Sequence, residues 1–301
     1  MNSQTTILTI DKSLQTLQLA DGRLLSYAEF GDPTGKPLFF FHGGNDSRLE
    51  AAILDGTAQK LGLRIIAPDR PGYGHSTFQP DRTFLDWPDD ITQLAEALFI
   101  DTFAVIGHSG GGPHAAAVAY TLPERLTNVA LVSSAAPPGS SNKGMHPMFR
   151  MVNFMMGHSP ILHRRLTQQT ADQVQNTPSK FFTQWGMMSK ADGRLFQERS
   201  DITAMITAEM QEAVHQGIEA ILQEHPLYKQ PWGFDLAAIK LPVHVWHGLA
   251  DAQAAPAWST YLVANLSNPI PHFVADEGHF SILVNQQADI LARALYGENA
   301  A

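Results

Sequence analysis

The chain has 301 residues, of which 44% are hydrophobic and 16% charged, and its formal net charge is −9. This composition is typical of a folded protein of one or two domains, and it excludes intrinsic disorder, collagen-like repeats and a coiled coil. With 20 Lys and Arg against 29 Asp and Glu, the chain lacks the basic excess that nucleic-acid binding requires. Because there is no cysteine, disulfides, thiolate metal sites and a cysteine nucleophile are excluded.

The N-terminal residues Met1–Thr6 are polar and show neither the basic patch nor the apolar run of a secretory signal. Nowhere does an uninterrupted apolar stretch approach the ~18 residues of a membrane-spanning helix. We therefore expect a soluble, cytoplasmic protein without a transmembrane segment.

The first half of the chain alternates strand-like and helix-like segments. Leu14–Ala20 and Arg23–Phe30 alternate apolar and polar residues around Asp21-Gly22, which predicts a β-hairpin. Continuous apolar runs predict strands that are buried on both faces. These runs are Pro37–Phe41, Leu63–Ala67, Phe103–Gly107 and Val129–Val132.

A helix is predicted after Asp86, with Pro88 in its first turn. Its expected apolar face consists of Ile91, Leu94, Ala95, Leu98 and Phe99. Buried strands that alternate with such helices predict a mostly parallel central sheet with helices on both faces.

Residues 138–230 break this alternation, because they show helical periodicity and no buried strand. Strand patterns return at Leu241–Trp246 and Ile270–Val274, and a helix is predicted over Ser281–Leu295. The sequence therefore predicts an α/β core formed by residues 1–137 and 231–301, with 138–230 as a helical insertion.

The sharpest chemical signal is Gly107-His108-Ser109-Gly110-Gly111, a G-x-S-x-G pattern between a predicted strand and a predicted helix. A strand that turns directly into a helix holds the central serine on a tight, strained turn, where glycines relieve crowding. The helix N-terminus directs N–H groups toward an oxyanion beside the serine. Ser109 is therefore the predicted nucleophile, and a glycine-rich turn with an incidental serine is the alternative.

A serine hydroxyl needs a base to remove its proton. His279 is the predicted base, because it lies in a loop between the last predicted strand and the last helix. His244 and His272 fall within strand patterns, where a structural role is the expected one. His108 and His114 lie too close to the serine along the chain to be aimed at its proton.

A carboxylate must orient the base and stabilise its cation. Asp251 follows the predicted strand Leu241–Trp246 and gives the chain order serine, aspartate, histidine. Asp276 and Glu277 lie nearer to His279 in the sequence and are the alternatives.

Acyl transfer also requires donors for the developing oxyanion, commonly backbone N–H groups. Gly110, directly after the serine, supplies one, and Gly44 in the loop after Pro37–Phe41 is the predicted second. A plain tight turn is the alternative interpretation of that loop.

These motifs together resemble the α/β-hydrolase superfamily, in particular its serine esterase and lipase-like members with a helical cap. The resemblance covers about residues 20–135 and 235–296, and Asn45 departs from it, since many members have proline there. The matching motifs are His42-Gly43-Gly44, Asp69-Arg70-Pro71-Gly72-Tyr73-Gly74-His75-Ser76, Gly107-His108-Ser109-Gly110-Gly111, Gly248-Leu249-Ala250-Asp251 and Gly278-His279.

The resemblance implies an α/β-hydrolase fold in which residues 138–230 form a cap. Met148, Met151, Met155 and Trp185 are expected either to line an adjustable apolar substrate pocket or to pack inside the cap, and Asn45 and His108 are further pocket candidates. An acidic cap pocket for a substrate amine is the less favoured alternative, because its four candidates are interpreted as helix surface. They are Glu198, Glu209, Glu212 and Glu219.

The implied function is hydrolysis of a carboxylic ester or related acyl bond by Ser109, His279 and Asp251 through an acyl-enzyme. The expected partner is a small, partly apolar acyl substrate, and the chemistry requires no cofactor or metal. The alternatives are a ligand receptor of the same fold with little turnover, an aminopeptidase, a lactonase or a C–C bond hydrolase.

Overall fold

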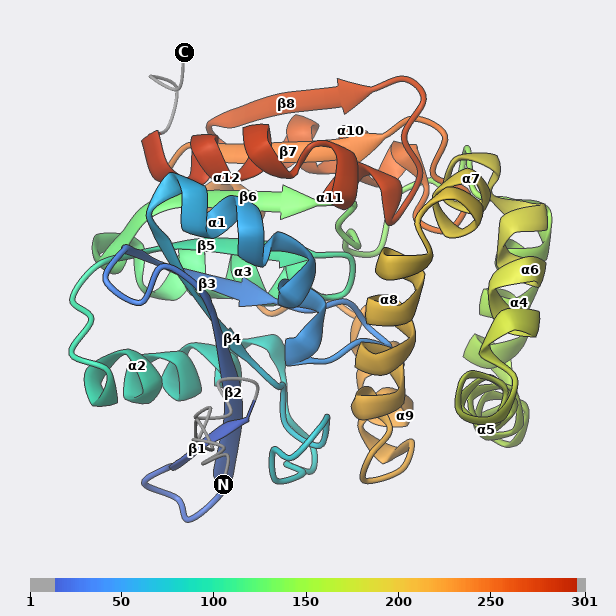
Figure 1. Ribbon diagram of the computed structural model, residues 1–301, viewed down its shortest axis with the longest axis horizontal. Coiled ribbons are helices and arrows are strands. Elements are labelled where there is room, and N and C mark those ends of the chain that lie inside the picture. Colours follow the sequence, from blue (N-terminus) through green and yellow to red (C-terminus); the bar gives the residue numbers. More distant parts are fainter. Residues whose placement is uncertain (1–13, 297–301) are drawn as a thin grey trace, which may run out of the picture.

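A mixed sheet of eight strands forms the centre of the protein, in the order β1-β2-β4-β3-β5-β6-β7-β8 (Figure 1). The computed structural model describes residues 14–296, so the prediction on secretory signals, which concerns Met1–Thr6, lies outside the described residues. β2 is antiparallel to β1 and to β4, and the other strand pairs of this sheet are parallel. The strands are β1 (Gln15–Gln18), β2 (Leu24–Gly31), β3 (Lys36–Phe41), β4 (Leu63–Pro68), β5 (Phe103–His108), β6 (Leu126–Val132), β7 (Val243–Gly248) and β8 (Pro269–Val274).

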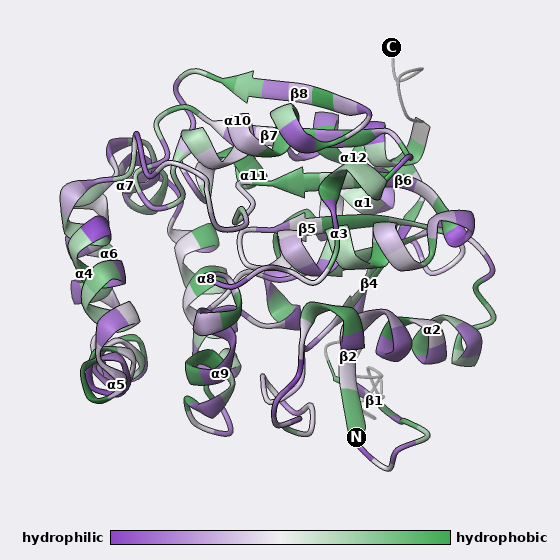
Figure 2. Cartoon of the chain, turned by 180° about the vertical axis from the view of Figure 1, so that it is seen from behind, coloured by the Kyte–Doolittle hydropathy of each residue, from purple (hydrophilic) through white to green (hydrophobic). Residues whose placement is uncertain are grey.

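Helices cover both faces of the sheet, and alternate residues of one strand serve the two layers. Phe39 and Phe41 of β3 belong to the core with α2, α3 and α10, whereas Leu38 and Phe40 belong to the core with α1, α11 and α12. Figure 2 shows hydrophobic residues along the central strands and mixed ones along a flanking helix such as α2. These helices are α1 (Asp55–Leu61), α2 (Trp87–Ala97), α3 (Gly111–Thr121), α10 (Pro256–Asn265), α11 (Ser281–Asn285) and α12 (Gln287–Tyr296).

Six α-helices lie between β6 and β7, a part of the chain in which every residue is described. They stand at the end of the sheet toward which the arrows of the parallel strands point (Figure 1). Ile53 and Phe280 of the core share an apolar cluster with several of these helices. The six are α4 (Pro147–His158), α5 (Pro160–Asn176), α6 (Pro178–Met188), α7 (Lys190–Glu198), α8 (Ser200–Ala213) and α9 (Glu219–Leu227). In residues 14–296, no helix is both long and apolar enough to cross a bilayer.

The predicted fold class, a mostly parallel sheet flanked by helices, is confirmed. The single helix predicted over Ser281–Leu295 is wrong, because the chain leaves helical geometry at Gln286, where φ is −102° and ψ 10°. The bend keeps Ile282 and Ile290, one on each side of it, in the same core layer.

Phe99 does not lie on the apolar face of α2, as expected, but is 96% exposed. Its N–H donates to Glu96 O and that of Ile100 donates to Ala95 O, the paired bonds of a Schellman motif. Phe99 occupies the left-handed position of this motif, with φ +56°, where glycine is favoured. The apolar periodicity therefore ends one residue earlier than the sequence predicts.

We expect Phe99→Gly to raise the free energy of unfolding by about 1 kcal/mol, since glycine removes the left-handed strain. Ala97→Gly, inside the last turn of α2, should lower it by about as much and serves as the control. Denaturant unfolding of both variants measures the difference, and a loss of stability in Phe99→Gly would contradict the assignment.

Candidate active site

Ser109 stands on a strained turn between β5 and α3, where its φ is +51°. Its N–H donates to Val132 O at 2.8 Å, which fixes the turn against β6. A Cβ on Gly107 would lie 2.4 Å from Gly111 O, and a Cβ on Gly111 would lie 2.1 Å from Phe41 O. Both glycines are therefore required by close approach of the main chain, as the G-x-S-x-G pattern predicts.

The structure brings Ser109, His279 and Asp251 together from three loops at the carboxyl ends of β5, β8 and β7. His279 Nε2 lies 3.0 Å from Ser109 Oγ, and His279 Nδ1 lies 2.7 Å from Asp251 Oδ2. Burial opposes ionisation of Asp251, but the neighbouring His279 lowers the pKa of this carboxyl below its ordinary value. An ionised Asp251 accepts the Nδ1–H, which leaves the Nε2 lone pair for Ser109.

The other candidates lie apart from this arrangement. His244 Nδ1 is 2.9 Å from His272 Nε2, so these two histidines of β7 and β8 hydrogen-bond each other. Asp276 is exposed, and Glu277 accepts hydrogen bonds from Asn285.

Gly44 and Gly110, the predicted oxyanion donors, lie side by side. A Cβ on Gly110 would be 2.8 Å from Gly44 N, and it would also be 2.3 Å from the hydroxyl oxygen of Tyr228. Only glycine at position 110 permits this approach. Asn45 is partly exposed beside the pair.

The carbonyl oxygens of the loop before Asn45 accept hydrogen bonds from two side chains to which the sequence analysis assigned no individual role. Arg70 donates to His42 O through Nη1 and to Gly43 O through Nη2, the latter at 2.8 Å. Tyr73 Oη donates to Gly44 O at 2.8 Å. Arg70 and Tyr73 belong to the motif Asp69–Ser76, and these contacts explain its position after β4.

Glu224 of α9 is the centre of this network. It is fully buried, and its carboxylate accepts from Arg70 Nε at 2.9 Å, from Arg82 and from the Tyr228 hydroxyl. Burial opposes ionisation of Glu224, but Arg70 and Arg82 hold its pKa well below the ordinary value. Sequence reasoning missed this residue, because a glutamate on a helix normally faces solvent.

A second buried network lies behind Ser109. His108 Nδ1 contacts Glu50 Oε1, and Glu50 Oε2 accepts from Gly43 N at 2.9 Å. Burial opposes protonation, but Glu50 raises the pKa of His108 to about 9. The imidazolium therefore also donates to His279 O, 3.2 Å from its Nε2. The candidate pocket residue His108 thus lies fully buried beneath the site.

Glu209 was expected on a helix surface, and this is wrong: it is fully buried. α8 packs against the 3-10 helix η1 (Arg48–Leu54), and the Ser47 N–H donates to Glu209 Oε2 at 2.9 Å. Burial and the nearby Glu50 raise the pKa of Asp46, next to Ser47, to about 7.

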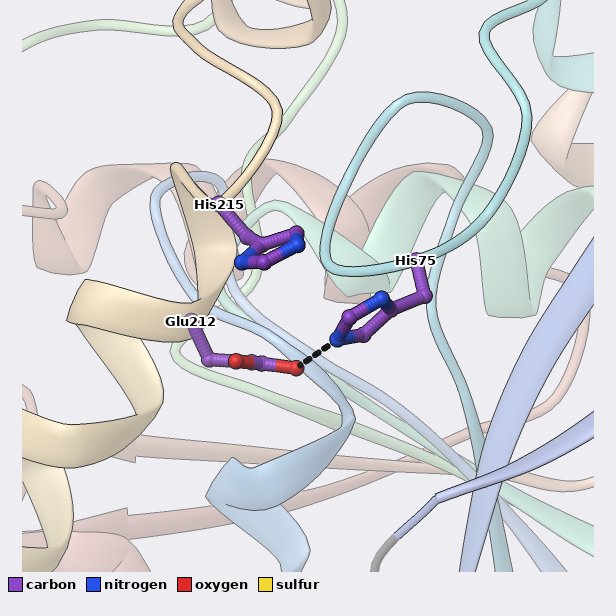
Figure 3. Close-up of side chains that lie close together, drawn as sticks. All are labelled: His75, Glu212 and His215. Carbon is purple, nitrogen blue, oxygen red and sulfur yellow. Dashed lines mark ion pairs between the residues drawn. The ribbon is translucent and has the colours of Figure 1, made fainter.

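Figure 3 shows His75, Glu212 and His215 converging where the loop after β4 meets the end of α8. Such a set could hold a divalent cation, since their ligand atoms lie within 4.8 Å of one another. However, Glu212 Oε1 already lies 2.7 Å from Arg48 Nη1 and 3.1 Å from His75 Nε2. Because Arg48 Nη1, which also pairs with Asp69 Oδ2 at 2.7 Å, already occupies this oxygen of Glu212, we assign the cluster to packing of α8 against the core.

The predicted pocket residues of the insertion fall into two environments. Met148 and Met151 on α4 are 47% and 49% exposed, and Met155 is partly buried. Trp185 is buried in the apolar cluster of the insertion, with its ring 5.4 Å from that of Phe280.

We expect Glu224→Gln to lower the free energy of unfolding by about 3–5 kcal/mol, because it leaves Arg70 and Arg82 buried without a carboxylate. Since the pKa of Glu224 is depressed in the fold, this stabilisation is present above its ordinary value of 4.5 and is lost as pH falls below it. Thermal unfolding between pH 3 and 8 measures the difference. The exposed ion-pair variant Glu219→Gln should match the wild type, and equal stability of Glu224→Gln would contradict the assignment.

Several known proteins are similar to this chain in sequence or in fold. Residues 36–286 match the family described as alpha/beta hydrolase fold. The chain is 35% identical to the dihydrolipoyllysine-residue acetyltransferase component of the acetoin cleaving system of Pseudomonas putida. This similarity extends over 116 residues, which are 38% of this chain and 31% of the relative. Over 122 residues, 39% of this chain and 43% of the relative, the chain is 33% identical to a bifunctional esterase/perhydrolase of Acinetobacter calcoaceticus.

The chain thus matches less than half the length of these relatives. The fold is also similar to that of an esterase from Exiguobacterium antarcticum, with a TM-score of 0.68 and 16% identity over 94% of this chain and 98% of that one. The family match spans strands β3 to β8 and all three loops that meet at Ser109. The chain belongs to the α/β-hydrolase fold family.

Proposed function

We propose that the protein is a serine hydrolase that cleaves a carboxylic ester or a related acyl bond through an acyl-enzyme intermediate. The observation that carries this proposal is the hydrogen-bonded chain from Ser109 Oγ through His279 to Asp251, with separations of 3.0 and 2.7 Å. A relative named as an esterase/perhydrolase and the fold of a solved esterase support it.

In the proposed reaction, Ser109 Oγ attacks the acyl carbon while His279 Nε2 accepts the hydroxyl proton. The same proton passes from His279 to the departing alkoxide, which leaves the acyl group bound to Ser109. A water molecule, deprotonated by His279, attacks this ester in turn. His279 then returns the proton to the departing Ser109 Oγ, and the acid is released. Asp251 remains ionised and stabilises the imidazolium in both steps.

The negative charge that develops on the carbonyl oxygen needs donors that are already in place. We propose that the N–H groups of Gly44 and Gly110 supply them, because the two glycines are adjacent and Arg70 and Tyr73 bind the carbonyls of the Gly44 loop. No reorganisation of this loop is then needed during the reaction.

We propose that residues 138–230 form a cap over this site, since their six helices lie at the end of the sheet that carries Ser109. In this proposal Met148, Met151 and Met155 face the acyl or alcohol part of the substrate, with Asn45 beside the oxyanion. The cytoplasmic location stays a prediction from the sequence.

Ser109→Ala should retain the fold and lower kcat for p-nitrophenyl esters by several orders of magnitude. A serine-directed phosphonate should label Ser109 in the wild type and leave the variant unlabelled. Retention of more than a few per cent of the activity by the variant would contradict the proposal.

The choice of base is tested by a matched pair of histidine variants. His279→Gln should abolish turnover, whereas His272→Gln should leave kcat within a few-fold of the wild type, because His272 bonds His244. The reverse result in a steady-state assay would show that the assignment of His279 as the base is wrong. A single slow turnover of every ester tested would instead favour a ligand receptor of this fold.

Met148→Ala should redistribute kcat/KM among esters of graded acyl length by about 10- to 200-fold, as expected for an apolar pocket. Its stability should change little, because Met148 is 47% exposed. Trp185→Ala should lower the free energy of unfolding by about 3–5 kcal/mol, because it leaves a cavity in the apolar cluster. A flat acyl-length profile for Met148→Ala would place the pocket wall elsewhere.

A further inference from the structure

A carboxylate of the helical insertion binds the main chain of the loop that carries His279. Asp192, in the first turn of α7, is fully buried. Its Oδ2 accepts the N–H of His279 at 3.0 Å, and its Oδ1 accepts the N–H groups of Phe280 and Ser281 at 2.9 and 3.0 Å. Three successive N–H groups therefore converge on one side chain from a different part of the chain.

The base loop is shaped to receive this carboxylate. A Cβ on Gly278 would lie 2.7 Å from each oxygen of Asp192, so glycine is required there by the approach of the carboxylate. Ser189 Oγ donates to Oδ2 at 2.6 Å from the side of the insertion. With four donors around it, the buried carboxylate is well satisfied, and charge-assisted bonds of this kind are the stronger ones.

These contacts complete the restraint of His279. Its side chain is bound by Asp251 and Ser109, and its carbonyl oxygen accepts from His108. The remaining polar group, its N–H, is bound by Asp192 alone among the described residues.

We propose that Asp192 is a positioning residue for the base, so that the insertion helps to set the geometry of proton transfer. This inference rests on the proposed hydrolase function. Asp192 does not touch the reacting atoms; it fixes the main chain from which the imidazole reaches Ser109. Because a displacement of about 1 Å can cost 100-fold in rate, loss of this anchor should appear in kcat rather than in KM.

The decisive variant is Asp192→Asn. The Ser189 hydroxyl can reverse and accept a hydrogen bond, so the new amide NH2 takes the position of Oδ2 and its oxygen keeps the bonds to Phe280 and Ser281. The His279 N–H then faces a donor and loses its acceptor. Ser189→Ala is the matched control, because it removes a bond to the same oxygen and leaves the His279 N–H bound.

We expect Asp192→Asn to lower kcat by about 10- to 100-fold with KM within about 3-fold of the wild type. Its rate of inactivation by a serine-directed phosphonate should fall by the same factor, since that reaction also needs the base. Ser189→Ala should keep both rates within about 3-fold of the wild type, even where its melting temperature falls as far as that of Asp192→Asn. Wild-type kcat in Asp192→Asn, or equal losses in the two variants, would overturn the inference.

Should Asp192→Asn fail to fold, Gly278→Ala decides, because its Cβ displaces the carboxylate from the loop. The same loss of kcat is expected, and wild-type turnover in this variant would overturn the inference. The two proposals fail separately: activity in Ser109→Ala contradicts the hydrolase function, whereas an inactive Ser109→Ala with a fully active Asp192→Asn contradicts only the role of Asp192.

Discussion

Close approach of the main chain around Ser109 is the constraint on which the site depends. The serine is held at φ +51°, and positions 107 and 111 admit no side chain because carbonyl oxygens lie 2.4 and 2.1 Å from where a Cβ would be. Gly44 and Gly110 meet in the same crowded region. The strain at Ser109 persists because the surrounding strands are buried on both faces, and it exposes the hydroxyl to His279.

Buried carboxylates of the insertion support the loops of this region. Glu224 binds Arg70, which holds the loop that carries Gly44, and Asp192 binds the N–H groups of the loop that carries His279. Burying charges costs free energy, and apolar replacements of similar volume are often no less stable. What the charges provide is a defined geometry, because each fixes several polar groups of the core at once. In this account the insertion and the core form one catalytic unit.

The sequence predicted the features that depend on local pattern. Continuous apolar runs located the buried strands, and the order serine, aspartate, histidine at strand ends located the three residues that the structure brings together. Glu224, Asp192 and Glu209 could not be found in this way, because an acidic residue on a helix looks the same whether it faces water or a partner distant in sequence. Arg70 and Tyr73 lay in a motif whose structural role becomes clear only with their contacts to the carbonyl oxygens of Gly43 and Gly44. Phe99 misled the prediction, because apolar periodicity does not reveal a Schellman ending.

Mass spectrometry of the protein quenched during turnover of a p-nitrophenyl ester would detect an acyl-enzyme on Ser109. We expect a transient mass increase equal to one acyl group, located by peptide mapping on the segment that contains Ser109. Turnover without any covalent adduct, or an adduct on another residue, would contradict it.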